Sequence, residues 1–212
     1  MVKKVQALSG ALFAAFVAVH LVNTWLASFG APAYDTFQGA VRTIYQAWLV
    51  EIALLALLVT HAGTGVLRMI RERGRERGPR QRWHRYAGVF LLVFMGGHIM
   101  AVRGPSWFFD IYPGFGGLAF SIDYAPYYFY PYYFLLAMAG FYHGLNGLSV
   151  ALPRLGLRLP VSNARLVGTT GVAAVLTVAA LLGLHGVWTD VGDPYATDFA
   201  RLALDLVDGW RR

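Results

Sequence analysis

Five long apolar runs, separated by shorter polar segments, dominate the pattern of this chain. Each run contains about the 20 residues that a helix needs to cross a hydrocarbon core roughly 30 Å thick. The runs lie at residues 5–26, 47–70, 83–102, 128–152 and 166–187. The first is too long for the hydrophobic region of a signal peptide, so we interpret it as a spanning helix. The pattern predicts an all-α integral membrane protein in which residues 1–212 form a single bundle of five transmembrane helices.

Two further segments carry apolar residues outside these runs. Residues 195–210 have the spacing of a short amphipathic helix on the outer membrane surface, with Phe199, Leu202, Leu204 and Leu206 as its apolar residues. The connection between the third and fourth runs is rich in glycine and aromatic residues, which favours a loop whose rings form an interfacial belt. These rings are Trp107, Phe108, Phe109, Tyr112 and Tyr124.

The composition agrees with a membrane protein and narrows its chemistry. Hydrophobic residues make up 57% of the chain and charged residues 14%, against about 25% charged in soluble domains. The mean hydropathy is +0.50. The chain has no cysteine, which excludes disulfides, thiolate-bound metals and the usual ligation of iron–sulfur clusters. A metal held by this chain would therefore use histidine.

The basic residues predict the orientation of the bundle. Residues 68–85 contain eight of the 18 lysines and arginines. Because loops rich in Lys and Arg stay in the cytoplasm, this segment and the N-terminus are expected inside and the C-terminus outside. The other basic residues on the inner side are Lys3, Lys4, Arg154, Arg158 and Arg165, and the aspartates on the opposite side are Asp35, Asp110, Asp123, Asp190, Asp193, Asp198, Asp205 and Asp208.

Four histidines fall into two levels of depth. Counting about 1.5 Å per residue from the predicted inner helix ends, His20 lies roughly 21 Å deep and His98 roughly 20 Å deep. By the same counting His61 lies roughly 10 Å deep and His143 roughly 15 Å deep. The first and third helices thus share an outer level, and the second and fourth share an inner level. We call His20 and His98 the outer pair, and His61 and His143 the inner pair.

Two such pairs favour two bis-histidine b haems, because imidazoles on facing helices can supply both axial ligands of the iron. The alternative is that each histidine only hydrogen-bonds to a neighbouring helix. Gly96 and Gly97 directly precede His98 and would leave room for a porphyrin, although glycines also serve ordinary helix packing. Arg68 and Arg103 are candidates to bind the haem propionates, or they snorkel to the interface.

The remaining two histidines lie near the membrane boundaries and are not expected to bind iron. We expect His84 at the inner interface, where it could border a quinone site. His185, at the outer end of the fifth run, has no partner left at its depth.

The four-histidine pattern resembles the five-helix dihaem cytochrome b subunit of succinate dehydrogenases and fumarate reductases, the succinate:quinone oxidoreductases of complex II. The matching motifs are HLVNTWLAS, EIALLALLVTHAGTGVL, WHRYAGVFLLVFMGGH and FYHGLNGL, so the likeness covers nearly the whole chain. The resemblance implies an outer haem held by His20 and His98, and an inner haem held by His61 and His143. It places the chain in a bacterial inner (cytoplasmic) membrane, as a multi-pass component of the respiratory chain linked to the tricarboxylic acid cycle.

The resemblance also implies partners. A flavoprotein subunit would hold the dicarboxylate site, and an iron–sulfur subunit would dock on the basic cytoplasmic face, with residues 71–82 as the natural surface. The chain would conduct electrons between that subunit and membrane quinone or menaquinone within the lipid bilayer. We expect no nucleic acid partner, and whole complexes could assemble as dimers or trimers.

Two places are candidates for the quinone site. At the inner boundary, hydrogen-bonding groups come from Ser9, Trp83, His84, Arg85 and Tyr86. At the outer boundary, Glu51 near the start of the second run could exchange protons with a quinol, because a carboxylate in an apolar span is a functional candidate.

Three other functions compete with this interpretation. Cytochromes b of quinol:cytochrome c reductases carry two histidines on each of two helices, with a spacing that His84 and His98 share, but no second helix of this chain repeats it. Ascorbate-reducing transmembrane cytochromes would pair His61 with His143 and His98 with His185, leaving His20 unused. A haem-free channel, transporter or metal-ion carrier would normally show more acidic residues within the membrane than Glu51 alone.

Overall fold

The protein is described by a computed structural model covering residues 2–210, which are largely helical and include no strand. Five helices are long and apolar enough to cross a membrane, as the sequence predicts. They are α1 (Val2–Leu26), α3 (Trp48–Arg71), α4 (Pro79–Phe109), α6 (Pro126–Ala151) and α7 (Asn163–Leu184). Short 3₁₀ turns extend α1 through η1 (Ala27–Phe29) and α6 through η2 (Leu152–Leu155).

The third spanning helix is longer at both ends than its apolar run. It begins at Pro79 in the basic segment, because a proline in the first turn needs no hydrogen-bond partner for its nitrogen. It ends at Asp110, which adopts the left-handed conformation that commonly terminates helices, with φ of 57°. α4 therefore includes Trp107, Phe108 and Phe109, which the sequence analysis assigned to a loop. All three rings are exposed.

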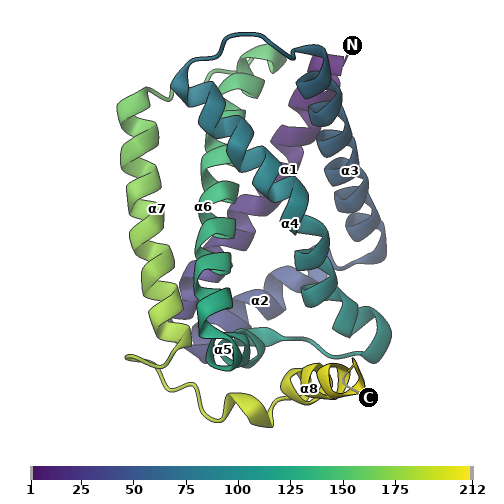
Figure 1. The fold of residues 1–212 in the computed structure, drawn as a ribbon, viewed down its shortest axis with the longest axis vertical. Coiled ribbons are helices and arrows are strands. Elements are labelled where there is room, and N and C mark those ends of the chain that lie inside the picture. The colour runs from purple at the N-terminus through teal and green to yellow at the C-terminus, as the bar shows by residue number, and fades with distance from the viewer. Residues whose placement is uncertain (1, 211–212) are drawn as a thin grey trace.

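Two helices between the spans were not predicted. They are α2 (Ala31–Tyr45) and α5 (Gly114–Tyr124). The predicted surface helix is α8 (Asp198–Trp210), which follows the short turn η3 (Pro194–Ala196). Figure 1 shows α2, α5 and α8 together at the end of the bundle that carries the C-terminus, while the N-terminus and the α3–α4 loop lie at the opposite end. We call the end with α2, α5 and α8 the capped end, and the end with the α3–α4 loop the basic end.

The main buried core lies at the capped end. It joins side chains of η1, α2, α5 and the second half of α7, namely Ala27, Tyr34, Phe115, Ala119, Ile122, Ala180, Leu181 and Leu184. Asp35 fixes α5 against α2 by accepting a hydrogen bond from the backbone N–H of Phe115 at 2.9 Å. Phe199 of α8 packs against Phe120. The spans themselves expose many large apolar side chains, as expected for surfaces that face lipid.

The five spans do not pack uniformly. α1 packs closely against α3 and α6, and α4 packs closely against α6. The pairs α1–α4 and α3–α6 have no comparable backbone contact, and α3 has no fully buried residue. Within each of these two pairs, the helices contact each other through side chains, including histidines.

Candidate functional site

The inner pair joins α3 and α6. The ring centroids of His61 and His143 are 5.9 Å apart, and the ring planes are nearly perpendicular at 85°. Each ring places Nδ1 against a backbone carbonyl, at 3.3 Å from the oxygen of Gln6 for His61 and 3.1 Å from that of His84 for His143. Since a carbonyl can only accept, Nδ1 carries the proton in a neutral ring and Nε2 keeps a free lone pair. This tautomer is the one that metal-binding histidines use.

Two glycines allow these rings to lie against neighbouring helices. A Cβ atom on Gly10 of α1 would lie 2.6 Å from Cε1 of His61. A Cβ atom on Gly88 of α4 would lie 2.8 Å from Cε1 of His143. Any other residue at either position would displace the imidazole. Sequence reasoning missed both glycines, although a small residue at the depth of a ligand on an adjacent helix is the signal that would have found them.

The outer pair joins α1 and α4. The ring centroids of His20 and His98 are also 5.9 Å apart, with ring planes at 71°. Phe16, one turn away on α1, stacks on His20 with its ring centroid 5.9 Å distant. Gly96 and Gly97 are exposed, and a Cβ atom on either would have no neighbour within 4 Å.

Both pairs meet the distance requirement of a metal held between two imidazoles. A metal–nitrogen bond is about 2.0 Å long and each ring centroid lies about 1 Å behind its nitrogen, so two coordinated rings stand about 6 Å apart. A haem brings four nitrogens of its own and needs only two protein ligands. Among residues 2–210, no group of three or more His, Cys, Asp or Glu side chains could hold a bare metal ion. A haem site needs only two protein ligands, so it does not depend on such a group. The residues present therefore fit haem.

Arg68 lies beside the inner pair and shares a partner with it. Its Nη1 donates to Oε1 of Gln6 at 2.7 Å, while the carbonyl of the same Gln6 holds His61. Its Nη2 donates to Glu72 at 3.2 Å. Its Nε is buried and has no hydrogen-bond partner. A buried donor left unpaired is costly, so this atom is suited to an additional acceptor such as a carboxylate.

Arg103 and Glu51, to which the sequence analysis gave separate roles, form an ion pair. Nε and Nη2 of Arg103 donate to the two carboxylate oxygens of Glu51 at 2.6 and 2.9 Å. Arg103 also donates to Ser106, and Trp107 donates its indole N–H to Glu51 at 3.3 Å. The side chains are 16% and 20% exposed, so the pair is sheltered and well hydrogen-bonded.

His84 packs against the inner pair. Its ring stacks face to face on His143, with centroids 4.1 Å apart and planes at 8°. Its Nδ1 is buried and has no hydrogen-bond partner. His185, in contrast, is exposed, and the ring found near it is that of Tyr130. His98 faces His20 and not His185, so the pairing of the ascorbate-reducing cytochromes finds no support in this geometry.

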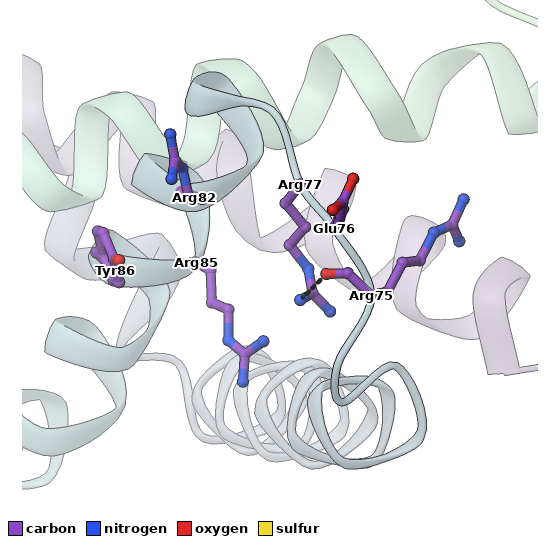
Figure 2. Close-up of a pocket in the computed structure, with 6 residues that line it drawn as sticks. All are labelled: Arg75, Glu76, Arg77, Arg82, Arg85 and Tyr86. Atoms are coloured by element: carbon purple, nitrogen blue, oxygen red, sulfur yellow. Dashed lines mark hydrogen bonds between the residues drawn. The ribbon is translucent and has the colours of Figure 1, made fainter.

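The five candidates for an inner quinone site have different surroundings. Ser9 is buried and donates to the carbonyl of Gln6 at 3.3 Å. Trp83 and Tyr86 are 64% and 59% exposed. Arg85 and Tyr86 instead line an open surface hollow of about 600 Å³, together with Arg75, Glu76, Arg77 and Arg82 (Figure 2). Of the five candidates, Ser9 is therefore buried, and His84 is half-buried with a buried Nδ1.

No family model, no curated protein and no solved structure matches this chain.

Proposed function

We propose that this chain is the membrane-anchor cytochrome b subunit of a succinate:quinone oxidoreductase or quinol:fumarate reductase. The single observation that supports it most is the meeting of two imidazole pairs, each at 5.9 Å, across helices that otherwise pack little against each other. Four histidines distributed at random over four helices would not be expected to meet in this way. The resemblance of the motifs to the dihaem family supports the same assignment.

In this proposal the chain's own residues hold and orient the cofactors. His61 and His143 would hold the inner haem through Nε2, while the carbonyls of Gln6 and His84 fix their rings. His20 and His98 would hold the outer haem. A bound haem would supply one-electron transfer. The unpaired Nε of Arg68 would be available to an inner propionate, and Arg103 is the cation at the outer level, where it is shared with Glu51.

The partners are proposed from what this chain lacks and from its charge. Without cysteine it cannot hold iron–sulfur clusters in the usual way, so the clusters and the dicarboxylate site belong to an iron–sulfur subunit and a flavoprotein. The arginines around the hollow in Figure 2, at the basic end, provide a positive surface for docking the iron–sulfur subunit. The lipid bilayer supplies the quinone or menaquinone.

The quinone site is proposed at the inner level, near His84. A quinone carbonyl needs a hydrogen-bond donor, and the buried, unpaired Nδ1 of His84 can be that donor. Glu51 at the outer level remains the second candidate, as a proton acceptor for a quinol. Quinone reduction kinetics of His84→Phe and Glu51→Gln variants would separate the two sites, since only the variant at the true site raises the KM for quinone.

The function is tested with the purified complex by reduced-minus-oxidised spectra of histidine variants. His61→Ala and His143→Ala should eliminate the same haem, and His20→Ala and His98→Ala the other. His185→Ala is the matched control, because His185 is exposed and outside both pairs, and it should keep both haems. A wild-type complex without a b-type spectrum would refute the proposal. Loss of one shared haem in a cross-level pair of variants would refute the assigned pairing.

A further inference from the structure

The guanidinium of Arg80 connects three helices near the basic end. Its Nε donates to Oδ1 of Asn146 at 2.5 Å and its Nη2 to Oγ of Ser149 at 2.8 Å, both on α6. Its Nη1 donates to the carbonyl of Val161, just before α7, at 2.8 Å and approaches Oδ1 of Asn163 at 3.4 Å. Four of the five N–H groups of an arginine side chain are thereby used by acceptors of this chain.

All four acceptors of Arg80 are neutral. Among residues 2–210 no carboxylate pairs with it, whereas Arg68, Arg77 and Arg103 each pair with a glutamate. An arginine side chain does not lose its proton in a protein. Arg80 itself is half-buried, and Asn146, which accepts from its Nε, is only 3% exposed, so solvent screens this charge only in part. Arg80 is therefore a permanent positive charge, fixed in place and without a counterion.

This charge lies about one helical turn from His143 of the inner pair along α6, and one turn from His84, which stacks on His143, along α4. On α4, Arg80 precedes His84 by four residues, and the ring of His84 stacks on His143 at 4.1 Å. On α6, Asn146 follows His143 by three residues, and its side chain is bonded to Arg80. Residues three or four apart on a helix are neighbours with Cβ atoms about 5–6 Å apart. The guanidinium is thus on the order of 10 Å from the inner pair. It is much farther from the outer pair, because His98 follows Arg80 by 18 residues on α4, roughly 27 Å along the helix.

We propose that Arg80 is an electrostatic tuning residue that makes the inner redox group easier to reduce than the outer one. The inference rests on the proposed function, since it assumes a haem between His61 and His143. Reduction adds one electron, and a unit positive charge about 10 Å away in surroundings of effective dielectric constant about 20 favours the reduced form roughly tenfold. For a one-electron couple, a tenfold change corresponds to about 59 mV in reduction potential.

Two variants remove the net charge in different ways. Arg80→Gln removes the guanidinium itself and with it several hydrogen bonds. Asn146→Asp keeps Arg80 and the bond to its Nε, and adds a carboxylate that neutralises it at nearly constant shape. Both variants should lower the reduction potential of the inner haem by about 59 mV, a tenfold change in the ratio of reduced to oxidised haem, and leave the outer haem unchanged.

The measurement is a spectroelectrochemical titration of the purified complex, with haems assigned by the histidine variants above. Arg165→Gln is the matched control, since Arg165 also lies near the basic end but is exposed and bonded to the carbonyl of Pro160. It should move neither potential. If Arg80→Gln loses the inner haem through misfolding, Asn146→Asp decides the matter.

An unchanged inner potential in Asn146→Asp, with both haems present, would overturn the tuning role and leave the proposed function intact. An equal shift of both haems would overturn it as well, because a charge near the basic end must act unequally on two levels. A wild-type complex without b haems would instead refute the proposed function.

Discussion

Replacing Gly10 with alanine should separate haem binding from helix stability. The new Cβ would lie 2.6 Å from Cε1 and 2.8 Å from Nδ1 of His61, whereas non-bonded carbon atoms prefer about 3.5–4.0 Å. The ring must therefore retreat by about 1 Å. The bond from Nδ1 to the carbonyl of Gln6, already 3.3 Å long, would then be lost. Gly88→Ala should act in the same way on His143.

The two consequences of Gly10→Ala have opposite signs. Alanine favours a helix over glycine by about 1 kcal/mol, and an imidazole free of iron can rotate away from the new methyl group. The protein without haem should therefore be as stable as the wild type or slightly more stable. With haem, loss of the hydrogen bond that orients a ligand weakens metal binding by about 10- to 100-fold. Only the inner haem should be affected.

The assay combines haem content per protein, reduced-minus-oxidised spectra and thermal unfolding in detergent. Gly168→Ala in α7 is the matched control, because its Cβ would meet nothing within 4 Å, and it should gain helix stability without losing haem. If Gly10→Ala keeps both haems with unaltered spectra, the ring of His61 does not lie where this geometry requires.

Three further predictions follow from partners of the site and from the cap. Arg68→Gln should weaken inner haem binding roughly tenfold or more, because it removes a residue that supports the site. The measurement is the haem content per protein, and an unchanged content of the inner haem would exclude a role for the unpaired Nε of Arg68. Glu51→Gln and Arg103→Gln should each lower the free energy of unfolding by about 1–3 kcal/mol, because each leaves a sheltered charge without its partner. If the losses simply add in the double variant, the two residues are not coupled. Burial raises the pKa of the Tyr34 phenol, so the protonated form stabilises the cap below about pH 10, and this contribution is lost as the pH rises through the folded-state pKa. Tyr34→Phe should therefore lose less thermal stability than the wild type between about pH 9 and about pH 11, and an equal loss would show that Tyr34 is not responsible.

The spans and the histidine pairs could be predicted because both depend on regular helix geometry. An apolar run of sufficient length determines a spanning helix, and a constant rise per residue converts position into depth. Applied to Glu51 and Arg103, the same counting would have placed both near the capped end and indicated their ion pair. The extension of α4 back to Pro79 was missed because the residues there are polar, and apolar runs mark only the part of a helix that contacts lipid.

The cap and the close contacts of the rings depend on tertiary structure. α5 contains three glycines, which favour a loop. In the fold, a Cβ atom on Gly116 would lie 2.8 Å from Cγ2 of Thr197, and one on Gly117 would lie 3.0 Å from Cδ1 of Phe199. These glycines therefore leave space for the segment that leads into α8. The need for that space comes from the tertiary structure and is not visible in the sequence around the glycines. The contact of Gly10 with His61 likewise depends on how α1 and α3 are rotated, which depth alone does not determine.

An experimental density map of the purified complex in a membrane mimic shows directly whether His20 with His98, and His61 with His143, each bind a metal between their imidazoles. The map should contain two flat densities of porphyrin size, each with one ring of the corresponding pair on either face. Lipid or protein side chains between the imidazoles of both pairs would contradict such binding.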